Sequence, residues 1–323
     1  MNGIRYSVVV PLYNEEAVID EMVRRLSRVL EDLGEPYEVV MVNDGSRDAT
    51  AGMARAICAA NPSFKLVNFA RNFGHQTAIT AGMDLSCGDA VVVIDADLQD
   101  PPEVIRDMIE KWKEGYEVVY GKRAARKGET WFKRVTARSF YRFLNRMTDV
   151  RIPVDVGDFR LIDARVRDAL LSVPEHNRYV RGLISWLGFR QTAVEFVREA
   201  RFAGETKYPL KKMVKLAVDG ITSFSYKPLK VGIGMGAFLS IASFLYLVAV
   251  LVMRLFRLTD MEPGYASLMA VMLFFFGVIL VMLGIIGEYI ARIFEEVKGR
   301  PLYVISDKVG EFHGRDRSAS TPS

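Results

Sequence analysis

Two carboxylates that directly follow an apolar, strand-like run give the sharpest chemical signal in the sequence. Asp95 and Asp97 come just after Ala90–Ile94, and Gln99 lies two positions further on. Acids beside a buried strand are costly unless something positive meets them. Mg²⁺ and Mn²⁺ prefer oxygen ligands and commonly join carboxylates to substrate phosphates. We therefore expect Asp95, Asp97 and Gln99 to form a divalent-metal site. In the competing interpretation the acids cap the next helix, which suits Asp100 better than the other two.

Polar residues also follow the other strand-like runs. Asp44 lies in an Asp-Gly turn sequence, which is first of all a turn signal. At a strand end, however, its carboxylate can also accept a hydrogen bond from a base or a ribose. Pro11, Tyr13 and Glu15 can likewise frame a nucleoside, with Tyr13 stacking on the base. From the residues alone, these segments can be either ordinary turns or a nucleoside site.

Cations and one further acid complete the candidate set. A run of Lys and Arg extends from Lys122 to Arg146, and part of it is expected to be a solvated helix face. Arginine forks suit phosphate oxygens, and we select Arg123 and Arg134 for the phosphate of an acceptor. Asp158 follows in a cluster of charges, where it can hold sugar hydroxyls or act as a base. A lone acid is usually a surface residue, so only the clustering supports this role.

The elements that must position these residues alternate between strand and helix over residues 1 to about 125. The first helical pattern places Val18, Met22, Leu26, Val29 and Leu33 on one stripe. Such alternation predicts an α/β fold with a doubly wound, mostly parallel sheet, whose carboxyl edge binds ligands. The expected strands are short and rich in Val and Ile, as is typical of strands covered on both faces: Tyr6–Val10, Glu38–Val42, Lys65–Phe69, Ala90–Ile94 and Glu117–Tyr120.

Two uncharged runs near the C-terminus predict transmembrane helices at about residues 231–253 and 265–287. Each has the roughly 20 apolar residues needed to cross a bilayer. Lysines precede the first run and basic residues follow the second, so both flanks are expected in the cytosol. Residues 206–228 carry apolar positions on one helical face and lysines off it, which favours an interfacial helix over an ordinary core-packing one. We therefore expect a cytosolic catalytic domain over 1–205, the interface helix over 206–228, the two spans within 229–291, and a cytosolic tail over 292–323.

Composition narrows the setting further. The 323 residues are 50% hydrophobic and 25% charged, with a net charge of only +4, and we expect no nucleic-acid partner. Two cysteines, Cys58 and Cys87, are too few for a disulfide framework and fit a reducing cytosol. The N-terminus enters a strand-like run with no signal-peptide pattern. Glycines in both spans allow close helix approach, either within the hairpin or between subunits of a homo-oligomer.

Four motifs together resemble glycosyltransferase family 2, which has the GT-A fold. They are Val9–Glu16, Asn43–Ser46, Asp95–Glu103 and Gly157–Leu161. The resemblance is closest to the branch of dolichol-phosphate mannose synthases and bactoprenol glucosyltransferases, and with Arg198–Tyr208 and the two spans it covers nearly the whole chain. The run Asp-Ala-Asp-Leu-Gln-Asp-Pro-Pro-Glu is its most specific element.

The resemblance implies a role for each matching residue. Pro11, Tyr13, Glu15 and Asp44 would hold the nucleoside, and Asp95 would lie near the ribose or the metal. Asp97 and Gln99 would bind Mg²⁺ or Mn²⁺, and Asp158 would lie near the reacting centre. Arg123, Arg134, Arg201 and Lys207 would hold phosphate groups, although the spacing from Arg123 to Arg134 varies within the family.

The implied activity is metal-dependent transfer of a sugar from a nucleotide diphosphate to a polyprenyl phosphate, with inversion. Gly157–Leu161 and the two spans favour a UDP-sugar such as UDP-glucose with undecaprenyl phosphate, at the cytosolic face of a bacterial inner membrane. The alternatives are a GDP-mannose-dependent synthase and a non-catalytic protein that binds lipid-linked sugars or supports a flippase. A processive polysaccharide synthase is disfavoured, because one hairpin provides no channel and no Gln-x-x-Arg-Trp element is present.

Overall fold

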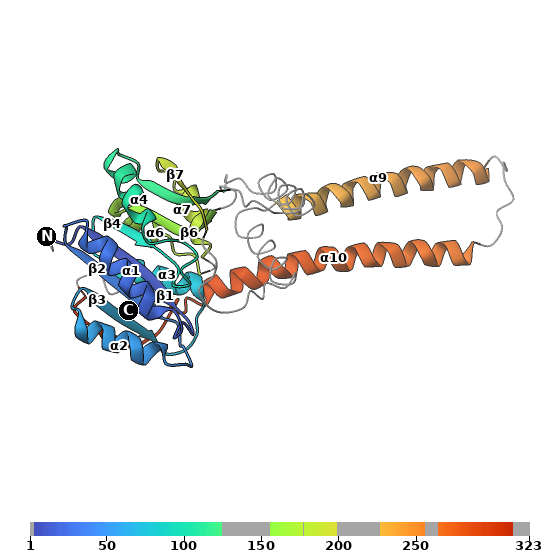
Figure 1. Cartoon of the computed structure of the whole chain (residues 1–323). Helices are drawn as coiled ribbons and strands as arrows, with labels where there is room; N and C mark the ends of the chain where they lie inside the picture. Colours follow the sequence, from blue (N-terminus) through green and yellow to red (C-terminus); the bar gives the residue numbers. More distant parts are fainter. Residues whose placement is uncertain (1–2, 125–155, 177, 199–226, 256–263, 313–323) are drawn as a thin grey trace. The chain divides into compact units, whose positions relative to one another are not determined.

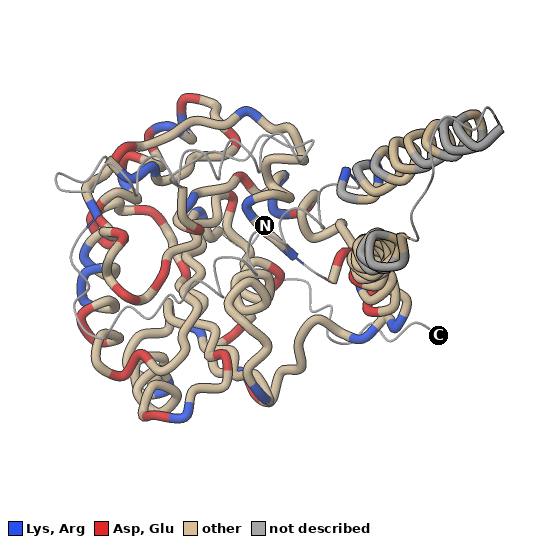
Figure 2. The backbone as a smooth tube through the Cα atoms, turned by 90° about the vertical axis from the view of Figure 1, so that its right-hand side faces the viewer, with Lys and Arg blue, Asp and Glu red and all other residues tan. Residues whose placement is uncertain are grey.

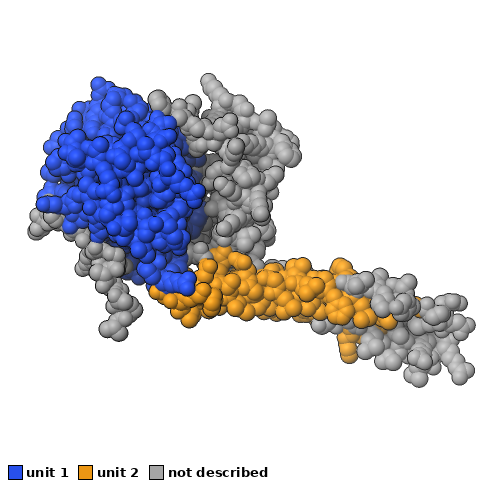
Figure 3. Space-filling model, turned by 90° about the horizontal axis from the view of Figure 1, so that it is seen from below, with its two compact units in different colours: residues 1–142, 150–213, 300–323 blue, residues 143–149, 214–299 orange. Residues whose placement is uncertain are grey.

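The computed structural model describes residues 3–124, 156–176, 178–198, 227–255 and 264–312. The chain divides into two compact units (Figure 3). Unit 1 comprises residues 1–142, 150–213 and 300–323, and unit 2 comprises residues 143–149 and 214–299. The described residues do not include 206–226 of the predicted interface helix, nor Arg134, Arg201 and Lys207, and α9 begins at Lys227.

Unit 1 is built on an eight-stranded sheet with the order β7-β5-β6-β4-β1-β2-β3-β8 (Figure 1). The pairs β1–β2, β1–β4, β2–β3 and β5–β7 are parallel, whereas β4–β6, β5–β6 and β3–β8 are antiparallel. The predicted doubly wound, mostly parallel sheet is confirmed, and its five expected strands are present. The strands are β1 (Tyr6–Leu12), β2 (Tyr37–Asn43), β3 (Phe64–Phe69), β4 (Ala90–Val93), β5 (Val118–Arg123), β6 (Val156–Asp163), β7 (Gln191–Phe196) and β8 (Ile305–Val309).

Helices cover both faces of this sheet. Helix α1 buries Met22, Leu26 and Val29, as the apolar stripe predicts, in a core shared with α2, α4 and one face of the sheet. Helix α3 packs on the opposite face, where Ala78 and Ala81 join Val40, Val42 and Val67 of the sheet. The helices of unit 1 are α1 (Ile19–Glu31), α2 (Thr50–Ala60), α3 (His75–Leu85), α4 (Val104–Lys113), α6 (Ala164–Ser172) and α7 (Val180–Trp186).

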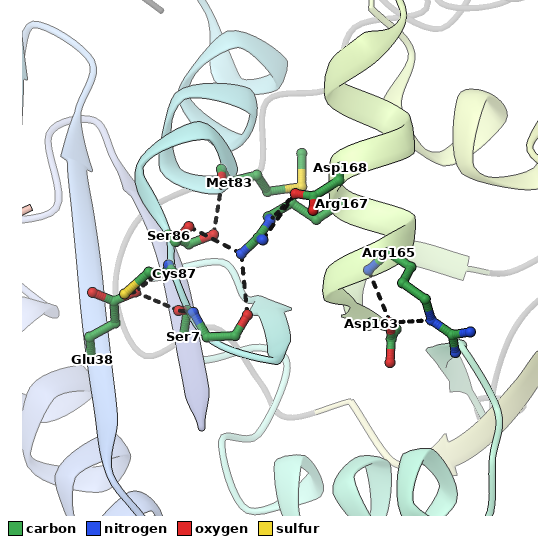
Figure 4. A network of polar contacts seen from close by, with 10 residues as sticks. Ser7, Glu38, Met83, Ser86, Cys87, Asp163, Arg165, Arg167 and Asp168 are labelled. Carbon is green, nitrogen blue, oxygen red and sulfur yellow. Dashed lines mark hydrogen bonds and ion pairs between the residues drawn. The ribbon is translucent and has the colours of Figure 1, made fainter. Parts of the chain in front are cut away.

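The amino edge of the sheet is fixed by a buried ion pair. Lys65 Nζ on β3 lies 2.6 Å from Glu38 Oε2 on β2, and both side chains are almost fully buried. Ser7 on β1 and the backbone N–H of Cys87 donate to the other Glu38 oxygen, at 2.5 and 2.8 Å (Figure 4). Helix α6 also contacts this edge, because its Arg167 side chain donates to the carbonyl oxygens of Ser86 and Gly88.

The C-terminal segment of the chain contributes strand β8, which the sequence pattern did not predict. Within the segment expected to be a tail, Ile305–Val309 pairs antiparallel with β3. Tyr303 anchors this segment, because its ring stacks on Phe69 with centroids 5.3 Å apart and its hydroxyl donates to Asp84 at 2.9 Å. The sheet of unit 1 is therefore completed by residues that follow α10 in the sequence.

Unit 2 contains the helices α9 (Lys227–Leu255) and α10 (Tyr265–Val297), which include the two predicted spans. Charged residues are frequent in unit 1 and sparse along α9 (Figure 2). A Cβ at Gly232 would lie 2.5 Å from Met282 Sδ, so this glycine permits close packing within the hairpin. In α10, Glu288 pairs with Arg292 at 3.3 Å, and such pairing lowers the cost of an acid near the end of an apolar helix.

One helix in the described part of the chain is long and apolar enough to cross a membrane, at Phe274–Val297. Large apolar side chains in this stretch are exposed, with Leu280 at 68% and Phe274 at 62%. Gly232–Tyr246 of α9 forms a shorter apolar stretch. Apolar surface of this extent is not left to water in a soluble protein, so the helix indicates membrane association.

Candidate active site

A pocket of about 520 Å³ opens at the carboxyl edge of the parallel strands. The loops after β1, β2, β3 and β4 all contribute, which is the location expected for a ligand site in a doubly wound sheet. Six predicted residues lie together in its lining, namely Pro11, Tyr13, Glu15, Asp44, Asp95 and Asp97. The lining is completed by Leu12, Asn14, Ala17, Val18, Asn72, Gly74, His75, Ala78 and Ala96.

The loop after β1 is held rigidly against the loop after β2. Asn14 has a φ of 56°, in the left-handed region that asparagine tolerates better than most residues. Its backbone N–H donates to Ser46 Oγ at 3.0 Å, and its side-chain oxygen accepts from the backbone N–H of Arg47 at 2.8 Å. The neighbouring Tyr13 stays 43% exposed, so its ring is available to a ligand in the pocket.

Asp44 is occupied by the loop that follows β3. Its carboxylate accepts from the backbone N–H groups of Phe73 and Gly74, at 2.6 and 3.0 Å. Burial raises the pKa of Asp44, and these two hydrogen bonds oppose that rise. Gly45 makes the loop contact sterically feasible, because a Cβ there would lie 2.7 Å from the backbone of Arg71. The binding of a nucleoside by Asp44 stays a prediction.

The acidic pair after β4 is arranged by a strained turn. Gln99 donates its backbone N–H to Asp97 Oδ1 at 3.1 Å, across Leu98. Leu98 is buried with a φ of 57°, a conformation that costs a bulky residue roughly 1–3 kcal/mol and is found mainly at functional sites. Gln99 is buried and does not line the pocket, so its predicted contact with a metal stays a prediction.

Asp95 is a poorly compensated acid, whose nearest cationic group is His75 Nε2, 3.4 Å from its Oδ1. Its Oδ1 is buried and accepts no hydrogen bond from any described residue. Burial raises its pKa to about 6. The charge of His75 opposes this rise, and the neighbouring acids Asp158, Asp100 and Asp97 add to it. A dication would reverse this cost by favouring the charged form.

The two acids of the pair suit a divalent cation that substrate phosphates also coordinate. Among the described residues, no group of three or more His, Cys, Asp and Glu side chains forms a complete metal cage. Mg²⁺ usually takes only one or two protein carboxylates when it bridges to phosphates, so a complete cage is not required. Asp95 and Asp97 therefore fit such an ion, with a diphosphate supplying further oxygens.

Asp158 on β6 lies beside the pocket and contacts His75. Its Oδ2 is 3.3 Å from His75 Nε2 and accepts from Gln76 Nε2 at 3.0 Å. Burial disfavours its ionisation, but His75 and the nearby Arg181 and Arg160 outweigh this and hold the pKa of Asp158 well below its usual range. Burial lowers the pKa of His75. The hydrogen bond with Asp158 and the charge of Asp95 outweigh burial and raise this pKa to about 9.

Several arginines lie close to the buried acids Asp158 and Asp100. Arg160 is buried and donates to the Gly157 carbonyl oxygen at 2.9 Å, and burial lowers its pKa to about 10. Asp100 Oδ1 lies 3.9 Å from both Arg123 Nη2 and Arg198 Nε. The expectation that Asp100 caps the next helix is wrong, because α4 begins at Val104 without a side-chain cap. Asp100 is instead a buried counter-charge for two arginines.

His75, Gln76 and Arg198 are neighbours of the site that sequence reasoning missed. His75 is one of only three histidines in the chain and comes three positions after Asn72, in a polar segment that follows a strand. That position was the available signal. The contact between Asp100 and Arg198 joins residues that are far apart in the sequence, and no local pattern predicts it.

Comparisons with known proteins identify relatives of this chain. Residues 7–171 match the family "Glycosyl transferase family 2", and residues 227–293 match "GtrB C-terminal hairpin". The chain is 56% identical to the uncharacterized glycosyltransferase YkcC of Bacillus subtilis, over 95% of each chain. It is 42% identical to the SfII prophage-derived bactoprenol glucosyl transferase of Shigella flexneri, over 94% of this chain and 97% of the relative. It is 38% identical to the prophage bactoprenol glucosyl transferase homolog of Escherichia coli K12, over 94% and 98%.

Proposed function

The chain belongs to glycosyltransferase family 2, and we propose that it transfers a sugar from a nucleoside diphosphate to a polyprenyl phosphate with inversion. The observation that carries this proposal is the pocket where Tyr13, Asp95 and Asp97 converge at the carboxyl edge of the sheet. Relatives named bactoprenol glucosyl transferase, similar over nearly their whole length, support a lipid phosphate as the acceptor.

The donor we propose is UDP-glucose or a related UDP-sugar, and the acceptor is undecaprenyl phosphate. The word glucosyl in the names of these relatives supports the sugar. In the pocket, Tyr13 would stack on the base while Pro11 and Glu15 frame the nucleoside. Arg201 and Lys207 would hold donor phosphates.

A divalent cation, Mg²⁺ or Mn²⁺, would be held by Asp95 and Asp97 with Gln99, and when bound it would neutralise the charge that develops on the departing diphosphate. The chain's own residues perform the remaining tasks. An acceptor phosphate oxygen attacks the anomeric carbon from the face opposite the leaving group. The bond from that carbon to the diphosphate oxygen then breaks, and the nucleoside diphosphate leaves with the electron pair.

Arg123 and Arg134 would bind the acceptor phosphate and orient it for attack. Because this phosphate is already anionic near neutral pH, the reaction does not require a strong general base. Asp158, which stays ionised, would therefore bind sugar hydroxyls near the reacting centre. Its contacts with His75 and Gln76 support such a fixed, positioning role.

Membrane association places the reaction at a lipid surface. We infer that α9 and α10 anchor the protein in a bacterial inner membrane with unit 1 in the cytosol. The match of residues 227–293 to "GtrB C-terminal hairpin" and the apolar stretch Phe274–Val297 support this location. An anchored catalytic unit meets a lipid acceptor at high effective concentration.

The test is a donor panel with purified protein in detergent. UDP- and GDP-sugars would be combined with undecaprenyl and dolichyl phosphate, and the lipid product identified by mass spectrometry. We expect a hexosyl undecaprenyl phosphate from a UDP-sugar. Product from GDP-mannose would replace the donor assignment, and nucleotide binding without any lipid product would favour a non-catalytic carrier.

A further inference from the structure

His75 connects two acids that come from neighbouring strands of the sheet. Its Nε2 lies 3.4 Å from Asp95 Oδ1 and 3.3 Å from Asp158 Oδ2. Asp95 follows β4 and Asp158 belongs to β6, which pairs with β4. The His75 side chain is 45% exposed and lines the pocket, so it is not a histidine enclosed in the core.

The first turn of α3 holds Asp158 through two successive residues. Beside His75, Gln76 donates from Nε2 to Asp158 Oδ2 at 3.0 Å. Gln76 is itself oriented, because its Oε1 accepts from the backbone N–H of Val180 at 3.0 Å, at the start of α7. Arg181, also on α7, places its Nε 3.8 Å from Asp158 Oδ1. Asp158 thus has partners from two helices.

The loop that precedes His75 in the sequence is held by hydrogen bonds to Asp44. Asp44, at the end of β2, accepts from the backbone N–H groups of Phe73 and Gly74. Asn72 donates from Nδ2 to the Asp44 carbonyl oxygen at 3.2 Å. Because the backbone just before His75 is anchored in this way, the His75 side chain is held at a fixed distance from Asp158, as is needed in a residue that positions another.

We propose that His75 is a positioning residue that fixes Asp158 relative to Asp95. The inference rests on the proposed function, in which Asp95 serves the diphosphate side of the pocket and Asp158 the sugar. By bonding Asp158 Oδ2 from the side of Asp95, His75 keeps the Asp158 carboxylate from turning toward the diphosphate. The sugar then meets Asp158 in one orientation, and a displacement of about 1 Å in such a group can cost about a hundredfold in rate.

The test compares His75→Ala, His75→Gln and a control, His176→Ala. Glutamine places an amide N–H near the position of the imidazole Nε2 and does not titrate. His176 is half-buried, contacts the Arg300 carbonyl oxygen and does not line the pocket. For His75→Ala we expect kcat to fall about 10- to 100-fold, as for loss of an orienting partner, with the Kd of UDP changed less than about threefold. His75→Gln should recover most of kcat, and the control should match wild type.

Three results would overturn the proposal. They are a wild-type kcat for His75→Ala, a kcat for His75→Gln as low as that of His75→Ala, and a loss of UDP binding that accounts for the whole loss of rate. A crystal structure of His75→Ala gives an answer that does not depend on turnover. We expect the Asp158 carboxylate to rotate away from its wild-type position, and an unmoved carboxylate would contradict the proposal. If wild-type protein forms no lipid product, the proposed function fails, while this structural comparison still decides the role of His75.

Discussion

At the scale of single residues, the site holds two acids, Asp95 and Asp158, whose surroundings shift their pKa values in opposite directions. Burial raises the pKa of Asp95 to about 6, while His75 and two arginines outweigh burial and hold the pKa of Asp158 well below its usual range. Paired acids with opposite shifts are typical of sites where they serve different tasks. The proposed divalent cation would favour the charged form of Asp95. Asp158 already has contacts with His75, Gln76 and Arg181.

The different roles proposed for the cation-site acids and for Asp158 predict unequal effects of neutralising them. Asp97→Asn removes a charge from the proposed cation site, and we expect transfer to fall by at least about a hundredfold, more than the loss of an orienting neighbour usually costs. Asp158→Asn should leave measurable transfer, because the attacking phosphate needs no strong base. Radiolabelled sugar recovered in the lipid fraction measures both. Transfer that survives both Asp97→Asn and EDTA would show that the metal role is wrong.

A second residue-scale prediction concerns the loop contact at Gly45. Its φ is +68°, and a Cβ would lie 2.7 Å from Arg71 C and Asn72 N, both backbone atoms that cannot easily move. We expect Gly45→Ala to lower stability by about 1–3 kcal/mol and to weaken UDP binding, because the loop that carries His75 must shift. Gly34→Ala is the matched control, since its φ is +66° and nothing lies within 4 Å. Equal melting temperatures and equal UDP affinities for the two variants would refute this account.

At the scale of elements, the sheet is fixed differently at its two edges. The carboxyl edge ends in loops that hold the pocket, and the amino edge is closed by the buried pair of Glu38 and Lys65. Burial disfavours the Glu38 carboxylate, but bonds from Lys65, Ser7 and the Cys87 backbone outweigh this and lower its pKa. Breaking a buried pair from one side leaves an uncompensated charge, whereas replacing both partners is often nearly neutral.

We therefore predict that Lys65→Met destabilises the protein by about 3–5 kcal/mol and that Glu38→Gln combined with Lys65→Met recovers much of the loss. Because the folded pKa of Glu38 lies below its unfolded value of 4.5, its contribution is present above that pH and is lost as the pH falls through the lower folded value. Melting temperatures in detergent between about pH 6 and pH 3 test this. A double variant that loses stability with acid as steeply as wild type would contradict it.

Strands and helices with a regular apolar pattern were predicted from the sequence, whereas strands β6 and β8, which lack such a pattern, were not. Five short Val- and Ile-rich strands and the stripe of α1 are confirmed, because burial on both faces or on one stripe leaves a clear pattern. Strand β6 was recognised only as a charged motif, since the buried Arg160 interrupts its apolar pattern. Strand β8 is short, polar and half-buried at the sheet edge, so its pairing with β3 depends on a contact across more than 230 residues.

At the scale of the whole molecule, topology explains how much of the site was predictable. Parallel strands bring their carboxyl ends to one edge, so residues after β1, β2 and β4 were expected together and do line one pocket. The roles of His75 and Asp100 depend on contacts between segments that no local pattern connects. Arg134, Arg201 and Lys207 lie outside the described residues, and their phosphate contacts stay predictions.

The central claim is that a divalent ion at Asp95 and Asp97 holds a nucleoside diphosphate in the pocket beside Tyr13. The most direct measurement is a crystal structure of the wild-type protein with Mn²⁺ and UDP, with the metal located by anomalous scattering. The account predicts an anomalous peak between Asp95, Asp97 and the diphosphate, with the uracil against Tyr13. A nucleotide bound elsewhere, with no peak at these two acids, would contradict it.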